Sequence, residues 1–141
     1  SEIERIFVSK FDFVHEYGYD YIGTSEAIKD LLGRSCTMSW KNSVIDRSFN
    51  IEYIEAGDYA LMGTLIIEIE NLCPPELEDD DYTSLSTRGI EIPRLSDMNG
   101  TFEERIGGCI SLAKKQIENE LHEIFIGKTW EKGHLDWSGL K

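Results

Sequence analysis

A dense run of acidic side chains is the group in this sequence best suited to chemistry of its own. It follows Pro74-Pro75, and its members are Glu76, Glu78, Asp79, Asp80, Asp81 and the adjoining Tyr82. Carboxylates at this density attract basic proteins and repel nucleic acid and anionic membrane. Tyr is a residue type enriched at interface hot spots. We therefore expect this acidic run to contact a basic protein; a solvated loop that only keeps the protein soluble is an equally weighted alternative.

The same carboxylates do not have the spacing of a calcium-binding loop. Such a loop places oxygen ligands at alternating positions around a central glycine and ends on a bidentate Glu. Here Asp79, Asp80 and Asp81 are contiguous, and no glycine follows at the required place. We expect no metal site in the acidic run.

The histidines and cysteines do not combine into a catalytic or metal site by spacing. His134 and Asp136 form the tightest His–carboxylate pair, and no further ligand is spaced to complete a zinc site. Cys36 has no motif that pairs it with a histidine base. A GxSxG motif and a glycine-rich phosphate loop are also missing from the sequence. The sequence therefore predicts no enzyme activity, no cofactor and no metal.

The whole chain shares the acidity of the run. It has 27 Asp and Glu against 14 Lys and Arg in 141 residues, a formal net charge of −13. Its densest basic spot is the pair Lys114-Lys115, so direct nucleic-acid binding is not expected. The expected partner is a basic protein, because complementary charge speeds association and fixes the register of binding.

Length and composition predict one folded domain over residues 1–141. Of these residues, 40% are hydrophobic and 11% aromatic, which suffices for a core at this size. Three widely spaced cysteines fit a reducing compartment, so we expect a cytoplasmic protein. No membrane-spanning stretch or signal peptide is visible, and no membrane contact is expected. The sequence begins at Ser1 without Met, which leaves a targeting segment before it as an open alternative.

Periodicity predicts two helices near the start of the chain. Apolar residues over 2–17 recur at three- and four-residue spacing, and Gly18 follows as a natural stop. A short second helix is predicted over 24–32, with Gly33 at its end.

A third helix has the strongest signal in the chain. Thr101 and Glu104 form a capping box, and an apolar stripe continues to about residue 126. Gly107-Gly108 weakens its first turns, and a close approach of this backbone to the sheet would explain the two glycines. The tail after it carries Trp130, which predicts that part of the tail packs back on the body.

The middle of the chain predicts strands over 36–45, 48–54 and 59–70. Residues 71–100 read as an acidic loop rich in turn formers, within which 89–93 can add a short edge strand. Alternation predicts that one face of these strands is apolar, carrying Phe49, Ile51, Tyr53, Leu65, Ile67 and Ile69. The other face is then more polar, carrying Asn50, Glu52, Ile54, Ile66, Glu68 and Glu70.

The order of these elements predicts an α+β fold. We expect an antiparallel β-meander of three to four strands, flanked by an N-terminal and a C-terminal helix. The helices would cover one face of the sheet and leave the other in contact with water.

Two stretches, Phe11–Tyr19 and Asp46–Ile51, resemble parts of small bacterial proteins that are sometimes found beside toxins. In size, acidity and helix–meander–helix layout the chain also resembles bacterial immunity proteins, including those of contact-dependent inhibition systems. The resemblance implies a protein that binds and neutralises a cognate toxin, with a basic nuclease-type toxin as the expected partner. Such a protein would plug the substrate groove of the toxin or block access to it.

Two other functions stay open at the level of sequence. A nucleic-acid mimic that inhibits a DNA-binding protein would share the acidity, but it would spread carboxylates at phosphate-like intervals along one face. A small ligand-binding or enzymatic domain would instead need a deep pocket that holds a buried carboxylate or histidine.

Overall fold

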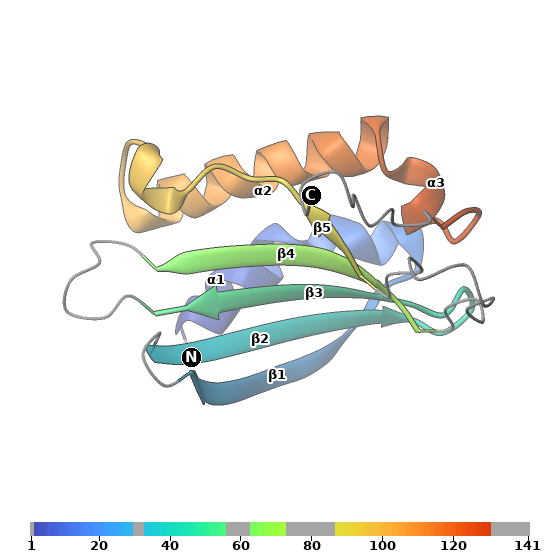
Figure 1. Cartoon of the computed structure of the whole chain (residues 1–141), viewed down its shortest axis with the longest axis horizontal. Helices are drawn as coiled ribbons and strands as arrows, with labels where there is room; N and C mark the ends of the chain where they lie inside the picture. Colours follow the sequence, from blue (N-terminus) through green and yellow to red (C-terminus); the bar gives the residue numbers. More distant parts are fainter. Residues whose placement is uncertain (1, 30–32, 56–62, 73–86, 131–141) are drawn as a thin grey trace, which may run out of the picture.

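The computed structural model of the protein describes residues 2–29, 33–55, 63–72 and 87–130 (Figure 1). Its α-helices are α1 (Glu2–Lys10), α2 (Phe102–Asn119) and α3 (His122–Phe125), and its 3-10 helices include η1 (Asp12–Tyr17) and η3 (Leu95–Asp97). Its strands are β1 (Asp20–Lys29), β2 (Gly33–Asn42), β3 (Arg47–Ile54), β4 (Thr64–Asn71) and β5 (Thr87–Ile90).

The strands form one antiparallel sheet in which every strand lies beside its neighbours in sequence, in the order β1-β2-β3-β4-β5. In Figure 1, α1 passes behind the strands and α2 runs beside β4 and β5. The predicted α+β meander with helices at both ends is confirmed. The sheet has five strands, rather than three to four, because β1 takes the place of a predicted helix.

The predicted helix over 24–32 is wrong, since residues up to Lys29 belong to β1. This strand pairs with β2 in a register that runs from Asp20 opposite Lys41 to Lys29 opposite Gly33. Main-chain pairing with β2 decides the conformation here, and the weak helical pattern of a short segment does not outweigh it. Thr24 and Ile28 are also β-branched residues, which have a higher propensity for strands than for helices.

The segment predicted as the first helix forms two helices of different type. Regular α-helix ends at Lys10, and the next turns tighten into the 3-10 helix η1. The tighter winding accompanies full burial of both Phe11 and Val14. The predicted stop at Gly18 is confirmed, because this residue has a φ of 90°, in the left-handed region that glycine adopts without strain.

The predicted capping box of α2 is confirmed. The Thr101 hydroxyl accepts a hydrogen bond from the Glu104 backbone N–H at 3.2 Å. The helix ends at Asn119 and a separate short helix, α3, follows, so the single helix predicted to about residue 126 is broken. Gly108 approaches Met98 rather than the sheet: a Cβ there would lie 2.4 Å from the Met98 methyl.

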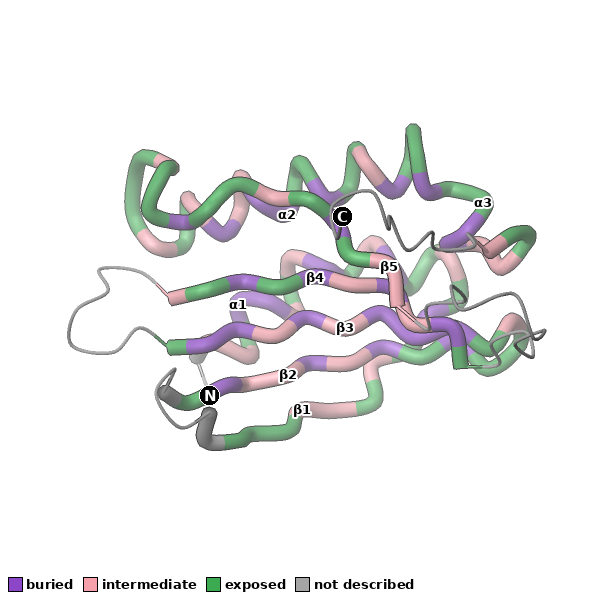
Figure 2. Tube along the Cα trace, in the orientation of Figure 1, coloured by how far each residue is buried: buried purple, intermediate pink, exposed green. Residues whose placement is uncertain are grey.

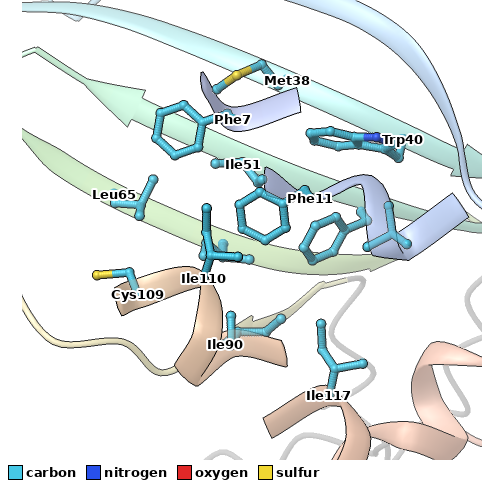
Figure 3. Packing of buried hydrophobic residues seen from close by; sticks show 14 of the residues in the cluster. Phe7, Phe11, Met38, Trp40, Ile51, Leu65, Ile90, Cys109, Ile110 and Ile117 are labelled. Atoms are coloured by element: carbon cyan, nitrogen blue, oxygen red, sulfur yellow. The ribbon is translucent and has the colours of Figure 1, made fainter. Parts of the chain in front are cut away.

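The hydrophobic core fills the space between the sheet and the helices (Figure 3). Phe7 and Phe11 enter it from the N-terminal segment, and Cys109 and Ile110 enter it from α2. The alternation predicted for β3 and β4 is confirmed on this side, where every second residue is buried. Val44, which the sequence pattern placed in a strand, lies in the turn between β2 and β3 and is 92% exposed.

Candidate binding face on the open side of the sheet

The side of the sheet that faces away from the core has no described helix over it (Figure 1). Side chains alternate between the two sides of a strand, so the pairing register identifies the residues that point to this side. We call it the open face, and in β2, β3 and β4 it comprises Ser35, Thr37, Ser39, Lys41, Ser48, Asn50, Glu52, Ile54, Thr64, Ile66, Glu68 and Glu70.

Three carboxylates gather on the open face, from the two neighbouring strands β3 and β4. Glu68 of β4 lies opposite Asn50 of β3. Glu52, the next residue of β3 on the same side, lies opposite Ile66 of β4. Glu70 follows Glu68 on the same side of β4. Such diagonal and second neighbours lie roughly 7 Å apart in a sheet, close enough for their charges to interact.

Glu68 is the carboxylate at the centre of this group. Its side chain is half-buried, and burial raises the pKa of its carboxyl above the ordinary range. The negative charges of Glu70 and then Glu52 raise this pKa further. A cation placed at Glu68 would therefore relieve repulsion as well as make a new contact.

The open face is hollowed around Glu68. A depression of about 490 Å³ is lined by Thr37, Ser39, Asn50, Glu52, Ile66 and Glu68. Hydroxyl and amide groups stand beside the carboxylates, and the Ser48 hydroxyl lies 3.0 Å from Asn50 Oδ1. Ile66 adds an apolar surface that is 40% exposed. The hollow therefore combines negative charge, hydrogen-bonding groups and a small apolar area.

These carboxylates do not make a metal site. No group of three His, Cys, Asp or Glu side chains in the described ranges could hold a metal ion. Lys41, opposite Ser48, is the basic residue among the open-face positions of β2, β3 and β4. On these three strands the face is thus negatively charged on β3 and β4, with a positive residue toward one end of β2.

The contact residues predicted from sequence are Glu76, Glu78, Asp79, Asp80, Asp81 and Tyr82, and all of them lie outside the described residues. Their role stays a prediction. Sequence analysis did not select Glu52, Glu68 and Glu70 as a site, although the alternation had placed them on the polar side of their strands. The missing information was the pairing of β3 with β4, which brings the three carboxylates together.

A second cavity, of about 540 Å³, opens near the start of β2. Its lining is Ile3, Glu26, Ala27, Arg34, Ser35, Cys36, Tyr53 and Glu55. Burial, and then the carboxylates of Glu26 and Glu4, raise the pKa of the Cys36 thiol. A protonated thiol is a poor nucleophile, and the described lining residues include no histidine that could act as its base. Nothing in the described part of this cavity therefore activates the Cys36 thiol.

The histidines in the described ranges make surface contacts. His15 Nδ1 lies 3.2 Å from an Asp20 carboxylate oxygen, and both side chains are exposed. The ring of His122 meets that of Tyr17 edge-on, with 6.2 Å between centroids. The pair predicted at His134 falls outside the described residues. None of the described helices combines the length and apolarity needed to cross a membrane.

Comparisons with known protein families, with curated proteins and with solved structures find no match to this chain. The fold and the open face are therefore the observations from which a function has to be argued. Neither observation depends on a residue role known from another protein.

Proposed function

We propose that this protein binds and neutralises a basic protein, as an immunity protein neutralises its cognate nuclease-type toxin. One observation supports this most: Glu52, Glu68 and Glu70 gather on an open sheet face, in a chain of net charge −13. An enzyme that acts on nucleic acid carries a basic groove, and an acidic surface of this kind competes for that groove. Neutralisation requires binding alone, so the protein needs no catalytic residue of its own.

Binding at the open face would combine two electrostatic effects. The net negative charge of the whole chain attracts a basic partner over a distance and raises the rate of association. At contact, a Lys or Arg of the partner meets Glu68, whose own neighbours Glu52 and Glu70 repel it in the free protein. A partner with acidic residues in the same place would be rejected by like charge.

The acidic run 76–82 stays part of this proposal as a second contact region. In the chain it lies between β4 and β5, the strands that hold and flank Glu68 and Glu70. The two regions make different predictions for mutagenesis. Variants of the open face and variants of the run therefore decide which of them carries the binding energy.

The test begins with capture of the partner from cells that make the tagged protein. Retention at low salt, elution by a salt gradient and mass spectrometry would identify a basic partner at unit stoichiometry. Addition of the purified protein should abolish the toxicity or the enzyme activity of that partner. If no such partner is recovered, or if a recovered partner keeps its activity in the complex, the proposal is wrong.

The open face is then tested with the triple variant Glu52→Gln/Glu68→Gln/Glu70→Gln. We expect slower association, weaker binding and a smaller dependence on salt than for the unchanged protein. The matched control removes the same charge from exposed positions on the helical side, as Glu103→Gln/Glu120→Gln/Glu123→Gln. Equal loss of affinity in the two triple variants would show that only net charge matters and would remove the open face from the proposal.

Two alternatives are separated by the same experiment. A captured DNA-binding protein that is released by added duplex DNA would favour a nucleic-acid mimic. The open face supports this alternative less well, because Ile66 interrupts its carboxylates. Recovery of a small-molecule ligand in place of a protein would favour a ligand-binding or enzymatic domain built on the cavity beside Cys36.

A further inference from the structure

The two edges of the sheet differ in how they are protected. At one edge, β5 has only four residues, and the chain just after it is held by α2. The Glu91 N–H donates to the Gln116 side-chain oxygen, and the Gln116 amide donates to the Glu91 carbonyl, at 3.2 and 3.1 Å. At the other edge, β1 is ten residues long and pairs only with β2 among the described strands.

The outer edge of β1 has few features that would prevent pairing: a register shift near its start and Lys29 at its end. Its residues from 20 to 27 are all exposed or half-buried, as Figure 2 shows in green and pink. Proteins usually protect such an edge with proline, lysine, a bulge or a short strand. In β1 the register shifts between Tyr21 and Gly23, near its start, and from Gly23 onward the pairing with β2 is regular. The outward backbone groups of this regular stretch can still accept another strand.

The residue displaced by the register shift is itself exposed and apolar. Ile22 has no partner position on β2, and its side chain is 61% exposed. Large apolar side chains at such exposure contribute to binding when a partner covers them. Further along the same strand, Glu26 is exposed and adds a negative charge.

We propose that β1 is a docking edge for an extended segment of the partner that carries lysine or arginine and adds to the sheet as a further strand. Main-chain hydrogen bonds would hold the segment, Ile22 would provide an apolar contact, and Glu26 would pair with a basic side chain. This inference rests on the proposed function, because it takes the partner to be basic. It names a third contact region, separate from the carboxylates of the open face and from the acidic run.

A second copy of the chain is a poorer occupant of this edge. Antiparallel pairing of two β1 strands over the whole of Gly23–Lys29 centres on Glu26, which then stands opposite its own counterpart. Like charges directly opposite each other destabilise a pair of strands. Each copy also carries a net charge of −13, so the two molecules repel each other.

The probe for this edge is a synthetic peptide of alternating valine and lysine, with blocked ends, added to the full-length protein. Hydrogen exchange followed by NMR should show that those amides of residues 23–29 that point away from β2 become protected when the peptide binds. The control is the same peptide with all of its backbone nitrogens methylated, which keeps its charge and removes the donors from both of its edges. The methylated peptide should give no protection.

Two matched variants test the apolar contact. Ile22→Ser should weaken peptide binding by about tenfold, the loss expected from the burial of one large apolar side chain. Leu112→Ser removes a comparably sized side chain, 42% exposed on α2, and should leave binding unchanged. Both variants replace exposed residues, so NMR spectra of the free proteins should show the fold intact.

Three results would overturn the docking edge: no peptide binding, peptide signals only around Glu68, or protection of β1 by a second copy without peptide. The last would appear as a dimer in sedimentation. None of these outcomes bears on the proposed neutralising function, which is judged by capture of the natural partner and by loss of its activity. Conversely, failure to find such a partner would contradict the neutralising function, whereas binding of the peptide to the β1 edge would still be judged by hydrogen exchange alone.

Discussion

At the scale of single residues, the proposed binding at Glu68 opposes the stability of the free protein. Its carboxyl is half-buried beside Glu70 and Glu52, and these surroundings raise its pKa. Such an arrangement disfavours the charged carboxylate in the free protein and favours any partner that brings a positive charge. Sites that keep a locally unfavourable group are often functional, because selection for binding offsets the cost in stability.

The pH dependence of stability tests this environment. The folded protein holds the Glu68 proton more tightly than the unfolded chain does, so Glu68 lowers stability as pH rises through its pKa. Glu68→Gln removes this effect. We expect the variant to unfold at a higher temperature than the unchanged protein at pH 7. The difference should shrink as pH falls through the raised pKa toward 4.5, the ordinary value for this carboxyl, and should vanish below 4.5, where both proteins are neutral at this position.

Thermal unfolding followed by circular dichroism at several pH values measures this difference. Glu91→Gln is the matched control, because Glu91 is exposed in the segment after β5. At pH 7 its effect on the unfolding temperature should be smaller than that of Glu68→Gln. A variant at Glu68 that is less stable than the unchanged protein at pH 7 would contradict the repulsion argued for the open face.

At the scale of elements, α2 begins with a capping box that compensates for two glycines of low helix propensity. The capping box at Thr101 and Glu104 satisfies backbone donors that the first turn leaves unpaired. Gly107 and Gly108 follow within two turns, and each costs roughly 1 kcal/mol relative to Ala. Only one of them has a close neighbour: a Cβ on Gly108 would lie 2.4 Å from the Met98 methyl, whereas on Gly107 it would lie 3.7 Å from Lys10 Nζ.

The two glycines should therefore respond differently to alanine. Gly107→Ala should raise the free energy of unfolding by about 1 kcal/mol, because it gains helix propensity and meets only ordinary contacts. Gly108→Ala should gain less, since the end of the Met98 side chain has to move. Urea denaturation of the two variants gives both values. Equal gains would show that the approach of Met98 does not restrict this position.

At the scale of the whole molecule, residues just before β1 and at the start of β3 contact the C-terminal part of the described chain. The Tyr19 hydroxyl donates to the Phe125 carbonyl at 2.6 Å, and the two rings stack with 4.3 Å between centroids. Buried Arg47 donates to the Ile124 carbonyl at 3.3 Å, and its guanidinium lies over the Trp130 ring. The prediction that the tail packs back on the body is thus confirmed at Trp130.

Removal of one hydroxyl measures the strength of this long-range contact. Tyr19→Phe keeps the stacked ring and leaves the Phe125 carbonyl without its donor, so we expect a loss of about 1 kcal/mol in the free energy of unfolding. Tyr17→Phe is the control, because the Tyr17 ring meets Phe125 edge-on while its hydroxyl donates to no described residue. Guanidinium denaturation compares the two variants. An equal loss in both would show that the hydroxyl contact is not the source of the effect.

The sequence by itself determined the parts of the fold that depend on local pattern. Alternation correctly assigned the faces of β3 and β4, and Thr101 with Glu104 correctly marked the start of α2, because period and capping are properties of neighbouring residues. The same patterns failed over 24–32, where a short segment carried a weak helical signal. Only pairing with β2 made that segment a strand, and this pairing joins residues that a local pattern does not connect.

The candidate site divides in the same way. Composition alone determined the net charge and led to the prediction of a basic partner, since net charge is a sum over the chain and needs no coordinates. The tertiary structure decided that Glu52, Glu68 and Glu70 share one face, over which no described helix lies, and that β1 is an edge strand of the described sheet. Register and strand order fix these neighbours, and both arise from contacts between residues far apart in the chain.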